Sequence, residues 1–182
     1  MYEKNTRLTL DLFLGITFLA TASLSSAQVS LTVQSEGIVQ GKIAKPHACR
    51  KMGGQDLAPA LSITGIPSEA KFVAIVADDP DAVSVAGKTW VHWNWFNIPA
   101  MPTLTIDAGK TPQGDAGKTS QGKGYEGMCP PNGTHTYRFA VFAMSERVDV
   151  SGFLGPTAMT IESFESKYKS AIVGKGEITG QF

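Results

Sequence analysis

Three short stretches of the chain carry polar residues of the kinds that bind anions or hold protons. Residues 77–82 read Ala-Asp-Asp-Pro-Asp-Ala, residues 90–93 read Trp-Val-His-Trp, and residues 130–137 read Pro-Pro-Asn-Gly-Thr-His-Thr-Tyr. Imidazole N–H groups, a phenol and the amides of a Gly-Thr segment are donors for an oxyanion, and a nearby carboxylate can orient an imidazole. If these stretches converge in the fold, they form a small anion pocket.

Each stretch also has an ordinary structural interpretation when it is taken alone. Asp79-Pro80-Asp81 after an apolar run is typical of a turn in which proline fixes φ and aspartate binds nearby amides. A single histidine such as His92 in a strand is more often a satisfied core residue. Pro130-Pro131 before a strand is compatible with an ordinary loop-to-strand corner, so the evidence for a site lies in the combination.

The elements that must position these residues are predicted to be strands. Residues 72–77 form a nearly continuous apolar run suited to a central strand, and residues 90–98 are aromatic and β-rich. Residues 136–144 alternate in a way that suits a strand covered on both faces, and residues 29–33 alternate as a half-buried strand does. Because side chains alternate along a strand, Trp90 shares a face with His92, and His135 shares one with Tyr137.

One helix is predicted near the C-terminus. Ile161, Phe164, Tyr168 and Ile172 recur at helical spacing, and Gly174 stands where a helix commonly ends. Residues 177–182 then indicate a short final strand or an extended tail. Residues 107–124 hold five glycines among polar residues, which predicts a surface loop that is either a passive connector or a mobile lid over a pocket.

The first residues are predicted to be a signal peptide over residues 1–27, leaving a single domain over residues 28–182. Lys4 and Arg7 precede an apolar run from Leu12 to Ala22, and Ser25-Ser26-Ala27 resembles a cleavage site. A membrane anchor is the alternative, but the run is shorter than the roughly 20 apolar residues of a spanning helix. We therefore expect a periplasmic or secreted protein with no transmembrane segment in the mature chain.

Composition argues against a nucleic-acid partner and leaves three possible states for the two cysteines. Sixteen basic residues balance 16 acidic ones, and without a basic surplus nucleic acid is not expected as a partner. Cys49 and Cys129 could form a disulfide in an oxidising compartment, Cys129 could be a reactive thiol near His135, or both could be buried thiols. Cys129 is the one candidate nucleophile near the histidines, but its spacing fits no hydrolase pattern, and the histidine and aspartate spacings fit no metal site. We expect no enzymatic activity, no cofactor and no metal.

Taken together, in this order and at these separations, the three stretches resemble the phosphatidylethanolamine-binding protein family, in its bacterial and archaeal Raf-kinase-inhibitor-like branch. The resemblance runs from about Cys49 to Phe182. It includes Leu57-Ala-Pro-Ala-Leu-Ser-Ile-Thr-Gly-Ile-Pro67, the Trp-Val-His-Trp strand with Asn97-Ile-Pro99 after it, and the Gly-Glu-Ile-Thr-Gly ending. It implies a mainly β fold, in which a large antiparallel β-sheet packs on a smaller sheet, with a C-terminal helix and a cavity near one end.

The resemblance also implies roles for individual residues. The ligand-binding set would be Asp79, Trp90, His92, Pro131, His135 and Tyr137, with Asp81 and Pro130 in structural roles. Two positions depart from the family pattern, because Val83 stands where a proline is usual and Thr136 stands where an arginine is usual. The ion pair of that arginine with the second aspartate, Asp81, is therefore in doubt, and Arg138 does not simply replace it.

These residues predict a non-catalytic binding protein for phosphate-bearing small molecules or phospholipid head groups. Trp90 and the Pro-Pro wall would exclude water and offer apolar or π surface to the alkyl or ammonium part of a ligand. The alternative is a protein-interaction role, as a regulator or inhibitor of a periplasmic or secreted partner such as a protease.

Overall fold

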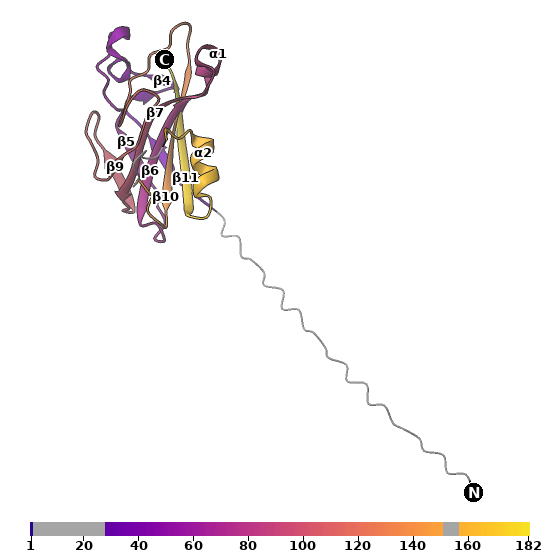
Figure 1. The fold of residues 1–182 in the computed structure, drawn as a ribbon. Helices are drawn as coiled ribbons and strands as arrows, with labels where there is room; N and C mark the ends of the chain where they lie inside the picture. Colours follow the sequence, from indigo (N-terminus) through magenta and orange to yellow (C-terminus); the bar gives the residue numbers. More distant parts are fainter. Residues whose placement is uncertain (2–27, 151–156) are drawn as a thin grey trace.

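The fold is seen in a computed structural model of the chain, which describes residues 28–150 and 157–182 together with Met1. The predicted signal peptide over residues 1–27 falls almost wholly outside the described residues. Two β-sheets and a few short helices make up the described part (Figure 1). This agrees with the mainly β architecture expected from the sequence.

The larger sheet has eight strands, and its long central strands are antiparallel to one another. Its order is β3 (Ile38–Val39), β4 (Lys42–Ile43), β11 (Ile172–Gln181), β10 (Thr136–Met144), β6 (Phe72–Asp79), β7 (Trp90–Pro99) and β9 (Asp115–Ala116), with β1 (Val29–Ser30) pairing with β11. The smaller sheet has the order β2 (Thr32–Gln34), β5 (Leu61–Thr64) and β8 (Thr103–Ile106).

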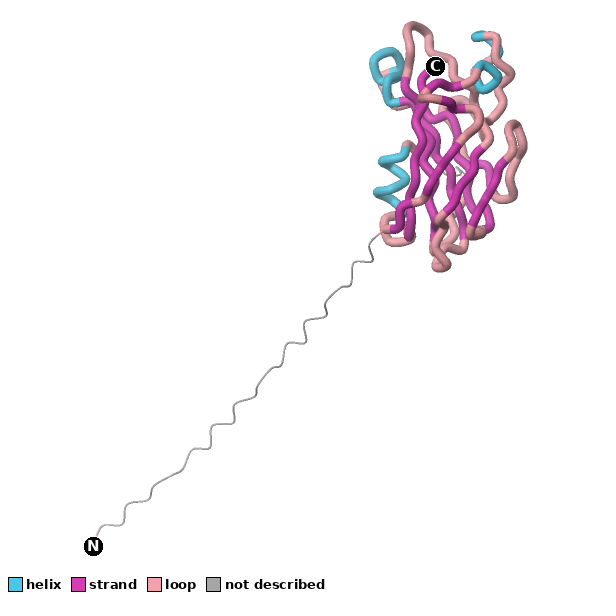
Figure 2. Tube along the Cα trace, turned by 180° about the vertical axis from the view of Figure 1, so that it is seen from behind, coloured by secondary structure: helices cyan, strands magenta, loops and turns pink. Residues whose placement is uncertain are grey.

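Helical segments are short. The α-helices are α1 (Val83–Ala86) and α2 (Ile161–Tyr168), and the 3₁₀ turns are η1 (Lys45–His47), η2 (Arg50–Met52) and η3 (Pro80–Ala82). Figure 2 shows α2 alongside the strands, while the other helical turns gather at one end. That end is where the polar stretches meet.

Strand β10 carries apolar side chains on both of its faces, and they pack in two separate core clusters. Tyr137, Phe139 and Val141 belong to a core cluster shared with the smaller sheet, whereas Phe142 and Met144 belong to a second cluster with α2. Full burial of an aromatic or aliphatic side chain of this size stabilises the folded state by roughly 1.5–3 kcal/mol. The predicted strand over residues 136–144 is confirmed, with the two-faced pattern that the alternation indicated.

Helix α2 is fixed to the second face by packing and by one buried carboxylate. Phe164 packs on Phe142 with ring centroids 4.8 Å apart. Asp78 on β6 accepts a hydrogen bond from the main-chain N–H of Ile161 (2.9 Å) and pairs with Arg138, whose guanidinium also reaches Glu162. The start of the helix is therefore tied to two adjacent strands.

Two predictions of secondary structure are wrong in part. The helix ends at Tyr168, and Ile172 and Gly174 lie in β11 rather than on the helix or at its end. Gly174 serves close strand packing, because a Cβ there would stand 3.1 Å from the carbonyl oxygen of Val29 on β1. The predicted strand over residues 29–33 is divided between the two sheets, since β1 pairs with β11 and β2 pairs with β5.

The antiparallel order explains how distant polar residues meet. Strand β6 ends where β7 and β10 begin, and β6 lies between them in the sheet. The last residue of β6, Asp79, pairs with Trp90, the first residue of β7. Residues 134–137 at the start of β10 reach the same edge, at the end of the molecule that carries α1 in Figure 1.

Candidate functional site

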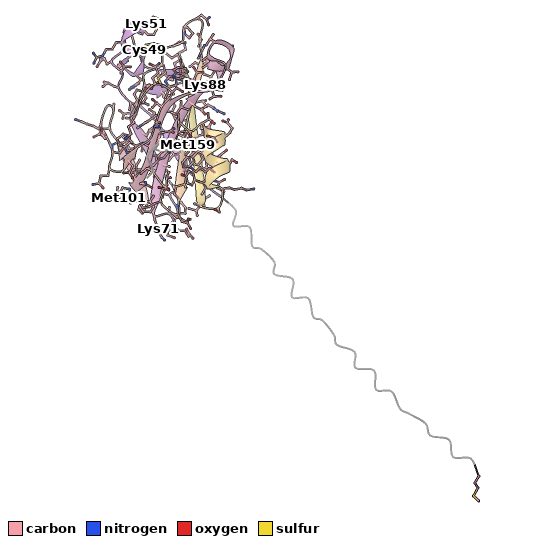
Figure 3. All side chains as sticks on the ribbon, in the orientation of Figure 1. Cys49, Lys51, Lys71, Lys88, Met101 and Met159 are labelled. Atoms are coloured by element: carbon pink, nitrogen blue, oxygen red, sulfur yellow. A yellow bond between two sulfur atoms is a disulfide. The ribbon has the colours of Figure 1, made fainter. Side chains whose placement is uncertain are left out.

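A pocket of about 590 Å³ opens at this end of the large sheet. Figure 3 shows Cys49 and Lys51 there, while Lys71 and Met101 lie at the opposite end of the molecule. The lining of the pocket comes from the ends of β6, β7 and β10, from α1, and from loops around residues 49–56 and 121–132. The lining residues are Cys49, Lys51, Asp56, Asp79, Ala82, Val85, Ala86, Trp90, His92, Gln121, Tyr125, Glu126, Gly127, Cys129, Pro130, Pro131, Asn132, His135 and Tyr137.

A buried hydrogen-bonded pair, Asp79 and His135, lies in the pocket wall. The Nδ1 atom of His135 stands 2.7 Å from Oδ2 of Asp79, and the two side chains are only 6% and 4% exposed. The second oxygen of Asp79 accepts the main-chain N–H of Ala82 at 3.1 Å, which closes the η3 turn. Asp79 therefore orients His135 and is itself oriented by the turn that Pro80 begins.

His92 is held by a main-chain carbonyl group. Its Nδ1 atom lies 3.0 Å from the carbonyl oxygen of Glu126, and its ring meets that of Tyr137 edge to face with centroids 5.2 Å apart. Burial lowers the pKa of His92 below its ordinary value, against smaller opposing effects from the Glu126 carbonyl and the Asp79 carboxylate. Burial therefore favours the neutral form of the ring.

Tyr137 lines the pocket and has an unpaired hydroxyl group. Its side chain is fully buried, and among the described residues its OH has no hydrogen-bond partner. Burial raises the pKa of this phenol well above its usual value, with smaller contributions from the charges of Asp79 and Asp81. The phenol is therefore a neutral donor that lacks an acceptor. Leaving a buried hydroxyl group unsatisfied costs about 1–3 kcal/mol of folding stability.

The outer part of the pocket is formed by Trp90 and Glu126. The indole N–H of Trp90 donates to a carboxylate oxygen of Glu126 (3.3 Å), and Lys88 lies over the indole ring at 5.2 Å from its centroid. The Glu126 carboxylate also accepts from the hydroxyl of Thr119 and from the N–H of Gln121. Glu126 thus joins the 107–124 segment to β7 beside the pocket.

A disulfide bond closes the opposite wall. Cys49 and Cys129 are bonded, with Cα atoms 5.4 Å apart, and the N–H of Cys49 donates to the carbonyl oxygen of Met128 at 2.9 Å. Pro130 and Pro131 follow directly and also line the pocket. Of the three states considered for the cysteines, the structure has the disulfide, and a free thiol at Cys129 is not present.

The structure brings the six residues predicted to bind ligand to this one pocket, namely Asp79, Trp90, His92, Pro131, His135 and Tyr137. Asp81 lies outside it and accepts the main-chain N–H of Thr136 at 2.7 Å. Arg138 points to the other face of the sheet, where it forms two hydrogen bonds with Asp78. A main-chain amide therefore holds Asp81 in this chain, and Arg138 has a separate role.

Sequence reasoning missed Glu126. Glu126 lies 36 residues from Trp90 and 34 from His92, so only its place just before the Cys-Pro-Pro corner could have suggested it. Both Nδ1 atoms already face protein acceptors, so an N–H group that either imidazole offers to an anion would be on Nε2.

Two further observations concern the described residues alone. None of the helices in the described ranges is both long and apolar enough to cross a membrane. Within the same ranges, no group of three or more histidine, cysteine, aspartate or glutamate side chains is placed to hold a metal ion.

Fold and site together define a mainly β protein with a small polar pocket at one end of a large antiparallel sheet. The sequence model of the family described as phosphatidylethanolamine-binding protein matches residues 32–182. The chain belongs to this family.

Similar proteins come from archaea and bacteria. A UPF0098 protein of Methanothermobacter thermautotrophicus is 36% identical over 149 residues, which cover 79% of this chain and 91% of the relative. The UPF0098 protein YbcL of Escherichia coli K12 is 35% identical over 148 residues, covering 74% of this chain and 80% of the relative. A Mycobacterium tuberculosis protein named provisionally as the lipoprotein LppC is 33% identical, covering 84% of this chain and 72% of the relative.

The fold is similar to a solved structure as well. The crystal structure of E. coli YbcL, described as a new member of the mammalian PEBP family, superposes with a TM-score of 0.69 and 26% identity. The superposition covers 84% of this chain and 97% of that structure.

Proposed function

We propose that this chain is an exported, non-catalytic binding protein that takes a phosphate-bearing ligand into the pocket between His92, His135 and Tyr137. The observation that carries the proposal is the buried hydroxyl of Tyr137, which lacks an acceptor although it lies beside the Asp79–His135 pair. A phosphate oxygen placed in the pocket would supply that acceptor and recover part of the cost of the unpaired group.

His135 and Lys51 are the groups that can attract the negative charge of the ligand. When the imidazole of His135 is protonated, the Asp79 carboxylate at 2.7 Å stabilises the imidazolium, and its Nε2–H can donate to an anionic oxygen. Lys51 at the rim adds a charge that is attractive to an anion. The aspartate does not contact phosphate itself but keeps the imidazole oriented.

The outer pocket suits the rest of a phosphate ester. The partly exposed ring of Trp90 and the side chains of Pro130 and Pro131 offer apolar surface to alkyl groups. An ammonium group over the indole would gain roughly 0.5–2 kcal/mol, and the Glu126 carboxylate bonded to that indole adds attraction. A phosphoethanolamine group therefore fits both parts of the pocket.

Export is supported by three observations of different kinds. The N-terminal residues have the composition of a secretory leader. The Cys49–Cys129 disulfide is the form that cysteines take in oxidising compartments. One relative carries a provisional lipoprotein name, which fits a protein exported to the envelope.

The groups around the histidines support the non-catalytic part of the proposal. Cys129, the one nucleophile suggested by the sequence, is consumed in the disulfide. Asp79 and the Nδ1 atom of His135 are already paired with each other. This leaves donors and acceptors that suit binding rather than nucleophilic attack.

Calorimetric titration of the protein without residues 1–27, with inorganic phosphate and phosphoethanolamine, tests the proposal. We expect saturable binding that falls at least tenfold in His135→Ala and in His92→Ala. Binding that is unchanged in both variants would place the phosphate site elsewhere. Hydrolysis of the ester by the wild-type protein would contradict the non-catalytic role.

A second candidate function is contact with a partner protein at the pocket mouth. Met52, Val83 and Val85 are 39%, 51% and 47% exposed, and Val85 lines the pocket itself. Apolar side chains around a pocket are typical of surfaces that meet another molecule. A periplasmic or secreted partner that is captured by the wild type but not by Val83→Ser/Val85→Ser would support this role.

A further inference from the structure

The hydrogen bonds in the pocket determine where the imidazole protons lie. A carbonyl oxygen only accepts, so the Nδ1 atom of His92, 3.0 Å from the Glu126 carbonyl oxygen, carries a hydrogen. A neutral imidazole has one N–H group, and its other nitrogen is an acceptor. The Nε2 atom of a neutral His92 therefore offers a lone pair to the pocket, not a donor.

His135 differs from His92 in the partner of its Nδ1 atom. That partner is the Asp79 carboxylate at 2.7 Å, so a His135 ring with hydrogens on both nitrogens would be paired with an anion at Nδ1 and would donate from Nε2 to a ligand. His92 has only a carbonyl partner and is buried, and burial lowers its pKa. The two imidazoles therefore differ in their surroundings, with a carboxylate partner for His135 and a carbonyl partner for His92.

The groups that face His92 come from every element around it. Asp79 at the end of β6 and Glu126 in the loop favour its charged form, whereas His135 ahead of β10 and burial disfavour it, with burial the largest effect. The neighbouring ring of Tyr137 on β10 is a neutral phenol. The surroundings as a whole lower the pKa of His92, with burial the largest cause.

The fixed charges of the lining do not favour a fully ionised ligand. Three carboxylate residues, Asp56, Asp79 and Glu126, line the pocket, and Lys51 is the one lysine or arginine among the lining residues. A dianion would meet more negative than positive groups at close range. A ligand that keeps a proton carries less charge and also brings a donor for His92.

We propose that the pocket selects phosphate groups that still carry a hydroxyl, with the P–OH group donating to Nε2 of His92 while other phosphate oxygens accept from Tyr137 and His135. This inference rests on the proposed function and specifies its ligand class. Phosphate monoesters and inorganic phosphate have such a hydroxyl, whereas phosphodiesters, including the head groups of intact phospholipids, do not.

A matched pair of ligands tests this selection directly. Phosphoethanolamine is a monoester and glycerophosphoethanolamine is a diester with the same ammonium end. At about pH 5, below the second pKa of about 6 for a phosphate monoester, we expect calorimetry to show about tenfold tighter binding of the monoester. This preference corresponds to about 1.4 kcal/mol, the scale of one buried hydrogen bond.

The pH dependence separates loss of the ligand hydroxyl from titration of the protein. Raising the pH to about 8 removes the P–OH hydrogen of the monoester, so its affinity should fall by more than that of the diester. The diester keeps one negative charge over this pH range, so any change in its affinity reports the protein alone, and the diester therefore serves as the control. A monoester that binds more tightly as the dianion would overturn the inference.

His92→Leu is the variant that tests the acceptor itself. Leucine is apolar and carries neither a donor nor an acceptor, so the P–OH group would lose its partner at this position. We expect this variant to lose the preference for the monoester while it still binds the diester. Equal affinity of the two ligands for the wild type would overturn the inference but leave the proposed function intact, whereas absence of binding by both would overturn the proposed function.

Discussion

The carboxylate of Asp79 lies 2.7 Å from the Nδ1 atom of His135, although the two residues are 56 positions apart in the chain. Their contact exists because β6 ends beside the start of β10 in an antiparallel sheet. The same edge receives Trp90 and His92 from β7. The pocket is therefore a consequence of strand order.

Asp79→Asn should weaken phosphate binding about tenfold. The amide oxygen of the substituted side chain can still accept from the Ala82 N–H, so the η3 turn is kept. The charge that stabilises a protonated His135 is lost. Titration calorimetry should show weaker binding with a melting temperature within a few degrees of the wild type, and unchanged affinity would show that this pair does not serve the ligand.

Removing the disulfide should destabilise the fold and loosen the pocket wall. The bond joins residues separated by 80 positions, and loss of such a bond typically costs about 2–5 kcal/mol. Cys49→Ser/Cys129→Ser should therefore unfold at lower denaturant concentration. The variant should also bind phosphate more weakly, because the disulfide is the covalent cross-link that ties the Pro130-Pro131 corner to residues 47–52.

Equal destabilisation of the wild type by a reducing agent, with no further effect on the double variant, provides the control. If reduction left the midpoint of wild-type unfolding unchanged, the bond would not contribute to stability.

Replacing Arg138 by methionine should destabilise the fold by about 2–4 kcal/mol at pH 7. The change leaves the fully buried Asp78 carboxylate without its cation, and breaking such pairs is costly. Arg138 is 22% exposed, so the effect should lie below that of a wholly buried pair. Chemical unfolding of the variant and the wild type measures it.

The cost of Arg138→Met should shrink as the pH falls. Burial, the largest effect, already raises the pKa of Asp78 in the wild type, so the folded state binds its proton more readily than the unfolded chain. Without Arg138 the upward shift is larger, and protonation on acidification then removes the uncompensated charge. A deficit that stays constant from pH 7 to about pH 4 would contradict this explanation.

Tyr137 and Tyr168 form a matched pair for testing which buried hydroxyl serves a ligand. Both OH groups are buried without a partner among the described residues, but Tyr168 lies on α2, away from the pocket. Each change to phenylalanine removes an unsatisfied polar group and should leave stability equal or raise it by about 1 kcal/mol. Phosphate affinity should fall in Tyr137→Phe alone, and an equal loss in Tyr168→Phe would indicate an indirect effect.

The sequence was most informative where a residue pattern had one physical interpretation. Residues 136–144 alternate two apolar sets, and the strand has those bounds. Gly174 was misleading because glycine serves both helix ends and close strand packing, and only the position of β1 distinguishes them. The break after Ser30 was equally hidden, since β1 and β2 join different sheets through partners far along the chain.

The residues of the site also fall into those that the sequence could predict and those that it could not. The six pocket residues could be named because three stretches preserve order and spacing, and the antiparallel sheet brings them together. Glu126 could not be named, because its role comes from contacts with residues 36 and 34 positions earlier. The acceptor character of His92 depends on one carbonyl group, which no residue pattern specifies.

The most direct test of the central claim is a crystal structure of the protein soaked with phosphoethanolamine. We predict phosphate density within hydrogen-bond distance of the Tyr137 hydroxyl and of both Nε2 atoms, with the ammonium group beside Trp90 and Glu126. Phosphate bound elsewhere on the surface, with the Tyr137 hydroxyl still unpaired, would contradict it.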